Sequence, residues 1–183
     1  MKDDEALRIL MVEYQAGSLD AFQEIYGTLA SELQRYLRYL AREPDSADDL
    51  LQETFLRLHR SRAAYNPTYA VKPWLFGLAR NVFLMKRRAA RRFTSVHTPS
   101  ADLPEVPVPP EVDRLGSAHE IRRSIAGLAE DQAEALLLHH EWGFTFDEIA
   151  GMLGVTAVAA RARASRGMAE LRQALSQTRR VGA

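Results

Sequence analysis

The sequence predicts an all-α protein made of two small helical domains joined by a proline-rich linker. Apolar residues recur at helical spacing on both sides of residues 93–117. No stretch of useful length shows the alternation of apolar and polar residues that is typical of a strand. Five of the eight prolines fall within residues 93–117, where proline removes backbone donors and prevents a helix or a central strand. We therefore expect domains at residues 1–92 and 118–183, with an extended acidic linker at residues 93–117.

The first domain is expected to contain four helices, each with one apolar face. The first helix ends near Gly17, and Ser18 is placed to cap the second. Apolar and small side chains then recur at helical spacing from Ala47, which predicts the third helix. A loop at residues 61–73, containing two proline steps, separates it from a last helix at residues 74–92.

The second domain ends in a helix-turn-helix pattern. Thr145 and Glu148 have the spacing of a capping box, which satisfies backbone donors at the start of a helix. Gly154 permits a tight turn, and Thr156 can cap the long basic helix that follows to about Leu175. Two shorter helices are expected before this pattern, one around Ile121 and Ile125 and one at residues 130–141.

The charged residues are segregated along the chain although the formal net charge is zero. Residues 1–53 are acidic overall, whereas residues 54–92 carry ten basic side chains and no acidic one. The order repeats, because residues 118–160 are acidic and residues 161–183 are basic. Two separated basic segments are typical of two contacts with a polyanion, and the acidic segments suit a basic protein partner.

The composition excludes several classes of function. The chain has no cysteine, and therefore no disulfide framework, thiolate zinc site or cysteine nucleophile. Its N-terminus is unlike a secretory signal and no apolar run could cross a bilayer, so we expect a cytoplasmic protein without membrane insertion. His139 and His140 adjoin Glu141, but neighbours on a helix point about 100° apart and rarely share a metal ion. With no nucleophile motif or phosphate-binding glycine loop, we expect no enzyme, no metal and no cofactor.

Three blocks of sequence form a combined pattern. The first is AFQEIYGTL with DDLLQETFLRLHR at residues 48–60, and the second is PWLFGLARN at residues 73–81 with a basic tail. The third, at residues 128–155, is LAEDQAEALLLHHEWGFTFDEIAGMLGV, ahead of an arginine-bearing helix. Together they resemble a bacterial RNA polymerase sigma factor of the extracytoplasmic-function type. The resemblance implies a sigma region 2 helical bundle at residues 1–92 and a region 4 helix-turn-helix at residues 118–183.

The resemblance implies an alternative sigma factor that binds the clamp coiled coil and the flap of core RNA polymerase and directs it to promoters. The positions that match the clamp-binding stretch of the family are Asp48, Asp49, Gln52 and Glu53. Acidic and amide groups on an exposed helix face suit a basic partner surface. Capping of the helix start is an alternative role for the two aspartates. Leu50, Leu51 and Phe55 are expected in the core.

The loop and the helix after it match the part of the family that opens the downstream (−10) promoter element. Holding an unstacked base needs aromatic rings, a polar pocket and cations for the backbone. The residues expected to contact this element are Arg60, Arg62, Tyr65, Asn66, Tyr69, Arg80, Asn81, Lys86, Arg87, Arg88 and Arg91. Arg80 and Asn81 match the family's ARN element, whereas Trp74 and Phe76 are expected in the core.

The resemblance places a recognition helix in the major groove of the upstream (−35) element. Its candidate contacts are Thr156, Ala157, Arg161, Arg163 and Arg166. Arg161 and Arg163 are two positions apart and cannot point the same way, so we expect one at bases and one at phosphate. The family commonly has threonine, valine, lysine and serine at the head of this helix. Residues 158–163 are instead rich in alanine, which leaves fewer hydrogen-bonding side chains for base edges.

Two other classes of function fit part of the pattern. A stand-alone helix-turn-helix regulator would leave the DDLLQETF and ARN blocks without a role. A sigma mimic that binds an anti-sigma protein and no DNA fits the acidic segments but not the ten basic residues at 54–92. We favour the sigma factor, with core RNA polymerase, promoter DNA and an anti-sigma protein as its partners.

Overall fold

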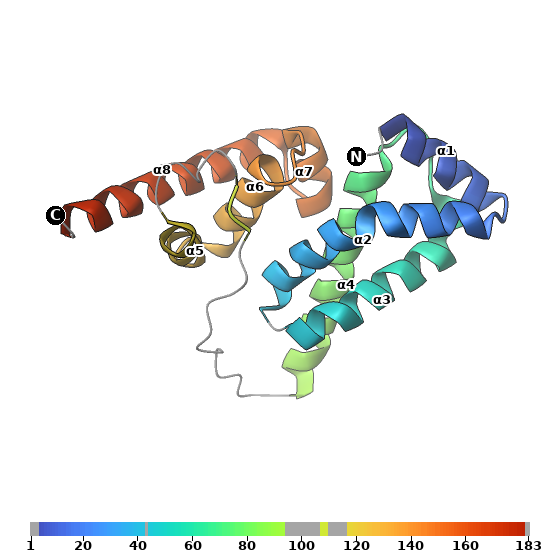
Figure 1. The fold of residues 1–183 in the computed structure, drawn as a ribbon, viewed down its shortest axis with the longest axis horizontal. Helices are drawn as coiled ribbons and strands as arrows, with labels where there is room; N and C mark the ends of the chain where they lie inside the picture. Colours follow the sequence, from blue (N-terminus) through green and yellow to red (C-terminus); the bar gives the residue numbers. More distant parts are fainter. Residues whose placement is uncertain (1–3, 43, 94–106, 110–116, 182–183) are drawn as a thin grey trace. The chain divides into compact units, whose positions relative to one another are not determined.

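The computed structural model describes residues 4–42, 44–93, 107–109 and 117–181, and every regular element in these ranges is a helix (Figure 1). The predicted all-α class is therefore confirmed. The chain divides into two compact units, Met1–Pro99 and Ser100–Ala183. Most of the expected linker at residues 93–117 lies outside the described residues.

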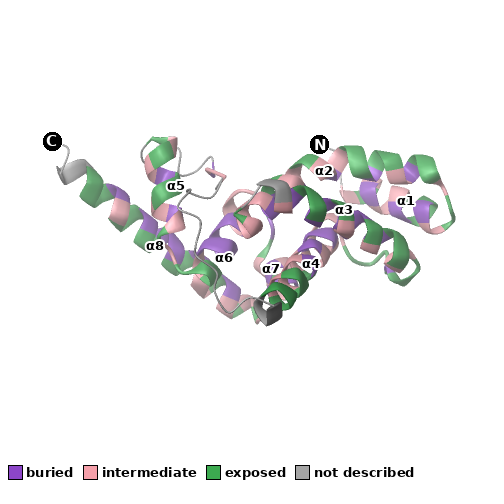
Figure 2. Ribbon diagram, turned by 90° about the horizontal axis from the view of Figure 1, so that it is seen from below, coloured by how far each residue is buried: buried purple, intermediate pink, exposed green. Residues whose placement is uncertain are grey.

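The first unit is built from four helices and a short 3-10 turn. These are α1 (Asp4–Gln15), α2 (Leu19–Ala41), α3 (Pro44–Ser61), the turn η1 (Arg62–Ala64) and α4 (Val71–Phe93). Helices α2, α3 and α4 pack against one another, and α1 packs on α2 and α4 (Figure 1). Tyr36 of α2 stacks on Phe76 of α4 in the core, with ring centroids 5.1 Å apart. Figure 2 marks the buried residues of these helices in purple, between stretches of exposed residues in green.

The local signals explain where these helices begin. Ser18 caps α2 as predicted, because its hydroxyl accepts a hydrogen bond from the Ala21 backbone N–H at 3.2 Å. The predicted loop at residues 61–73 is too long at its end, since α4 begins at Val71 rather than Trp74. Pro73 falls in the first turn of α4, where a backbone N–H would have no helical partner and its loss costs nothing.

The second unit consists of three shorter helices packed against one long helix. They are α5 (Ala118–Ala126), α6 (Glu130–His140), α7 (Phe146–Leu153) and the long α8 (Ala157–Val181). Each of the three packs against α8. Helix α8 extends beyond its expected end near Leu175. Gly167 of α8 faces α6 at close range: an added Cβ would lie 3.1 Å from the backbone oxygen of Gln132.

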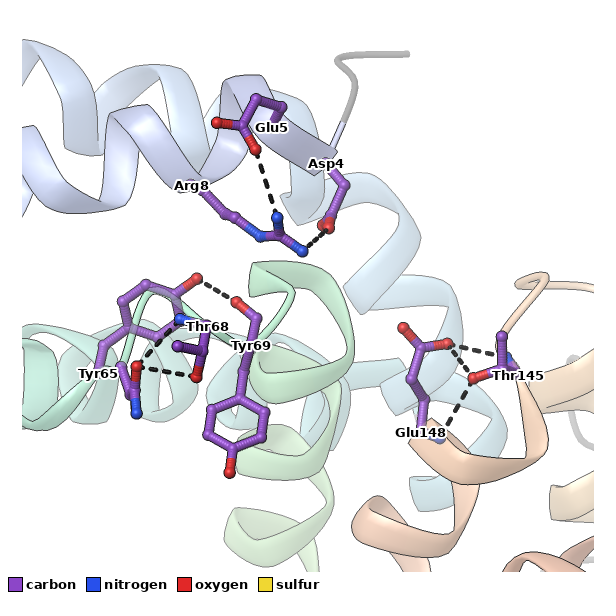
Figure 3. A network of polar contacts seen from close by, with 9 residues as sticks. Asp4, Glu5, Arg8, Tyr65, Thr68, Tyr69, Thr145 and Glu148 are labelled. Carbon is purple, nitrogen blue, oxygen red and sulfur yellow. Dashed lines mark hydrogen bonds and ion pairs between the residues drawn. The ribbon is translucent and has the colours of Figure 1, made fainter.

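The helix-turn-helix prediction is confirmed in detail. The Thr145 backbone N–H donates to Glu148 Oε2 at 2.8 Å, and the Glu148 N–H donates to Thr145 Oγ1 at 3.3 Å, which completes the capping box (Figure 3). Gly154 ends α7 with a φ of +67°, a conformation that glycine adopts without strain. Thr156 then caps α8 by accepting a hydrogen bond from the Ala159 N–H at 3.2 Å.

Candidate functional site

The start of α3 presents a polar face beside a buried apolar one. Leu50, Leu51 and Phe55 are buried as predicted. The four residues expected to bind core polymerase are exposed or half-buried: Asp48, Asp49, Gln52 and Glu53. Because α3 begins at Pro44, both aspartates lie beyond its first turn. The alternative that they cap this helix was therefore wrong.

Three of these polar residues contact side chains of the bundle. Asp48 Oδ1 accepts a hydrogen bond from Gln34 Nε2 at 2.7 Å, a partner that the sequence did not reveal. Asp49 pairs with Lys86 of α4 at 3.3 Å between carboxylate and ammonium. Both members of this pair are largely exposed, so water screens it and it contributes about 0.2–1 kcal/mol at most. The structure thus brings the expected polymerase face next to one expected promoter contact.

Glu53 is joined to α4 through an arginine. Its Oε1 lies 3.2 Å from Arg57 Nε, and the same guanidinium donates through Nη1 to Met85 Sδ at 3.1 Å. Met85 itself is 49 % exposed. The thioether accepts only weakly, so the charge of Arg57 is balanced mainly by the Glu53 carboxylate.

The segment between η1 and α4 is a compact loop held by its own side chains (Figure 3). Asn66 Oδ1 accepts hydrogen bonds from the Thr68 N–H at 3.0 Å and the Thr68 hydroxyl at 2.9 Å. The Tyr65 hydroxyl donates to the backbone oxygen of Tyr69, and the Tyr65 ring packs on Trp74 with centroids 5.0 Å apart. The loop therefore has a defined shape.

The two loop tyrosines differ in exposure. Tyr65 is only 4 % exposed, so it supports the loop and does not present the free aromatic face that we expected of it. Tyr69 is 66 % exposed and does present one. Burial raises the pKa of the Tyr65 hydroxyl, against an opposing effect of Arg8 and a smaller raising effect of Asp4. Arg8 and Asp4 belong to α1, where the Arg8 guanidinium pairs with the Asp4 carboxylate at 2.9 Å (Figure 3).

The basic and amide residues expected at the −10 element lie on α4, at the end of α3 and in η1. Asn81, Lys86, Arg88 and Arg60 are exposed, whereas Arg80, Arg87 and Arg62 are half-buried. The Arg87 guanidinium lies 5.4 Å from the ring centroid of Phe83, which orients it along the helix. The side chain of Arg91 lies outside the described residues. Phe76 is buried as expected, but Trp74 is half-buried.

The recognition helix separates its first two arginines. Arg163 pairs with Asp131 of α6 at 3.2 Å and is half-buried. Arg161 and Arg166 are exposed, and the Arg161 guanidinium lies 5.0 Å from the ring centroid of Phe146 at the start of α7. Ala157 is half-buried, whereas Val158 is 79 % exposed. The expectation that Arg161 and Arg163 differ in direction thus has a structural basis in these separate contacts.

The comparisons with known proteins match both units. Residues 25–93 match the family model for Sigma-70 region 2, and residues 118–171 match that for Sigma-70, region 4. The chain is 30 % identical over 167 residues to the RNA polymerase sigma factor CarQ of Myxococcus xanthus, covering 91 % of this chain and 96 % of that protein. It is 28 % identical over 167 residues to the ECF RNA polymerase sigma factor SigM of Mycobacterium tuberculosis, covering 91 % and 83 %. The chain belongs to the extracytoplasmic-function sigma factors.

Solved structures share the fold of this sigma factor. CnrH in complex with the cytosolic domain of CnrY matches with a TM-score of 0.69 at 23 % identity, covering 94 % of this chain and 98 % of that one. The sigma factor RpoE in complex with the anti-sigma factor NepR from Bartonella quintana also matches with a TM-score of 0.69, at 20 % identity, covering 86 % and 98 %. The function is that of an alternative sigma factor in transcription initiation, and the stand-alone regulator is set aside because region 2 is present.

The described part of the sigma factor holds neither a candidate metal-binding cluster nor a candidate membrane span. No group of three or more histidine, aspartate or glutamate side chains there is arranged to hold a metal ion. None of the helices there is long and apolar enough to span a membrane.

Proposed function

We propose that this sigma factor uses three separate surfaces in promoter-specific initiation. The polar face of α3 binds core RNA polymerase, and the loop at residues 61–70 with α4 binds the opened −10 element. The first turns of α8 bind the −35 element. The observation that carries this division is electrostatic. Residues 54–92 carry ten basic side chains and no acidic one, whereas the acidic residues that the structure describes in the first unit lie on α1, α2 and α3.

On the α3 surface, the geometry favours Asp48 and Gln52 as the leading polymerase contacts. Both are exposed, and the bond from Gln34 to Asp48 is itself accessible to a competing partner. Asp49 and Glu53 already pair with cations of the first unit. Such exposed pairs are weak enough for a basic partner surface to exchange them at little cost.

On the loop surface, Tyr69 is the aromatic residue that supports strand binding. Its exposed ring offers a stacking platform for an unpaired base, which is worth about 1–3 kcal/mol per base in other single-strand binders. Asn66 lies three residues away at the same loop, and the exposed cations of α4 suit the phosphates of the same strand.

On the recognition helix, we assign base or phosphate contact to Arg161 and Arg166. Arg163 is held by Asp131, so its guanidinium is already partly neutralised at the interface with α6. The Thr156 hydroxyl is already engaged in capping α8. Ala157 and Val158 offer only apolar contact, such as with a thymine methyl group. We therefore expect weak base discrimination at the upstream element.

We also propose that an anti-sigma protein regulates this chain and that the chain itself catalyses no bond formation. Among the solved structures of similar fold, RpoE is in complex with the anti-sigma factor NepR, and CnrH is in complex with the cytosolic domain of CnrY. The first unit exposes apolar side chains that a partner could cover, among them Ile9, Val12, Leu19, Tyr26 and Leu56. Co-purification of a stable inhibitory partner from the native cell would support this proposal, and its absence from inactive cells would contradict it.

The division of surfaces is tested by two sets of charge changes in the full chain. Replacing Arg80, Arg87 and Arg88 together with glutamate should abolish promoter opening while core binding survives. Replacing Asp48 and Gln52 with arginine should instead weaken core binding. Core affinity is measured by titration with labelled sigma factor, and opening by permanganate reactivity of thymines at promoters first mapped by run-off transcription.

Each set of variants is the control for the other. Equal loss of core binding in both sets would refute the separation of α3 from α4. Thermal unfolding of every variant shows whether a lost activity comes from a lost fold, because the changed side chains are exposed or half-buried and should leave the core intact.

A further inference from the structure

Helix α1 precedes the region 2 match, which begins at residue 25, yet it contacts η1, the 3-10 turn that follows α3. The contact centres on Gln15, the last residue of α1. Its amide Nε2 donates to the backbone oxygen of Arg62 at 2.8 Å and to that of Tyr65 at 3.0 Å. These two carbonyls lie at the two ends of η1. One amide group therefore fixes both ends of the turn that leads into the loop.

Neighbouring residues strengthen this contact. The Tyr14 hydroxyl lies 2.7 Å from His59 Nδ1, and the Tyr14 ring is 2 % exposed. The Arg62 guanidinium lies 5.8 Å from the centroid of the Tyr14 ring, and its Nη1 donates to the His59 backbone oxygen at 2.6 Å. The end of α1 thus holds the end of α3 and the start of η1 in one arrangement.

The hydrogen bonds within the loop itself are local in sequence. The bonds of Asn66 with Thr68 and of Tyr65 with Tyr69 span two and four residues. They define the internal shape of the loop, and the packing of Tyr65 on Trp74 joins the loop to the first turn of α4. The bonds from Gln15 span 47 and 50 residues, and so fix where the loop stands. A loop already held in its binding arrangement loses less conformational entropy when it takes up a strand.

We propose that Gln15 is a positioning residue for promoter opening, which holds the loop at residues 61–70 where its exposed face can receive the unstacked −10 base. This inference rests on the proposed role of the loop. In this proposal Gln15 does not contact DNA, because it acts through the backbone of Arg62 and Tyr65.

The test compares three variants in the full chain bound to core polymerase. Gln15→Met keeps the length of the side chain but removes both donors, and Gln15→Glu keeps the shape but places a carboxylate against two carbonyl oxygens. Gln23→Met is the matched control, because Gln23 is exposed on α2. Each holoenzyme is assayed for core affinity, for opening of a duplex promoter, and for transcription from the same promoter premelted over the −10 element.

We expect both Gln15 variants to open the duplex promoter roughly tenfold less, as the loss of two hydrogen bonds implies, with core affinity within about twofold. Premelted template should restore most of the transcription. Amide hydrogen exchange at residues 61–70 of the full chain should become faster, while exchange in the core of α2 stays unchanged. A merely structural defect would speed exchange throughout the unit and lower core binding equally.

The outcomes separate this inference from the proposed function. If charge reversal of Arg80, Arg87 and Arg88 blocks opening while Gln15→Met opens the duplex like the original chain, the inference is overturned. If the charge reversal also leaves opening intact, the proposed role of the loop and α4 falls with it. Equal loss of core binding and opening in Gln15→Met would likewise overturn a positioning role.

Discussion

Two tyrosines of the first unit hold their protons more tightly than free tyrosine. Burial raises the pKa of Tyr14 above its usual value of 10.0, against an opposing effect of Arg62, and burial also raises the pKa of Tyr65. Because the folded chain keeps these protons to higher pH than the unfolded chain, the resulting stability is fully present below pH 10. It is lost as the pH rises through the folded-state pKa values.

Tyr14→Phe tests this account. The variant keeps the buried ring but loses the hydrogen bond with His59, so the free energy of unfolding at pH 7 should fall by about 1 kcal/mol. Above pH 10 the variant should lose stability less steeply than the original chain, since one of two titrating groups is gone. Urea denaturation at pH 7, 9.5 and 10.5 measures both effects, and parallel pH curves would contradict the second.

Single residues also show where sequence reasoning stops. The pattern of loop 61–73 identified aromatic and polar side chains but could not tell that Tyr65 turns inward onto Trp74 while Tyr69 faces outward. Gln15 carried no local signal at all, because its partners lie 47 and 50 residues later in the chain. Contacts of that kind depend on how helices pack, which one helix's periodicity does not encode.

At the scale of elements, periodicity and caps predicted the helices, and the errors fall at their ends. Ser18, Thr145 and Thr156 cap helices where expected, because each cap satisfies a local backbone donor. The start of α4 was misplaced because Pro73 was taken as a loop residue, although the first turn of a helix tolerates proline. The small residues of α8 did not predict the close approach of α6 at Gly167.

Two glycines on helices of the second unit should respond oppositely to alanine. Gly167→Ala places a Cβ 3.1 Å from a carbonyl oxygen of α6, and the overpacking should outweigh the better helix propensity, for a net loss of about 1 kcal/mol. Gly151→Ala meets nothing within 4 Å and should stabilise the unit by about 0.5–1 kcal/mol. Chemical denaturation of the full chain measures both, and a stabilising Gly167→Ala would show that α6 shifts easily.

At the scale of the whole molecule, zero net charge coexists with surfaces of opposite sign. The prolines of residues 93–117 and the repeated order of acidic and basic segments predict two units from the sequence alone. Contacts such as the Asp49–Lys86 pair place the two signs side by side on the first unit. Such a chain binds DNA through the surfaces on which its basic side chains cluster. Its affinity for DNA is therefore set by the number of phosphate contacts there, which salt weakens, and not by the net charge of the chain.

The salt dependence of promoter binding therefore measures how many basic side chains of α4 contact phosphate. Replacing Arg87 and Arg88 with alanine should lower the slope of log affinity against log salt by about two for the holoenzyme on duplex promoter. Glu13→Gln is the control, since it changes an exposed charge on α1, outside the three proposed surfaces, and should leave the slope unchanged. Filter-binding titrations between about 50 and 200 mM salt cover the range in which such contacts dominate. An unchanged slope in the double variant would remove both arginines from the promoter interface, even if its affinity fell at every salt concentration.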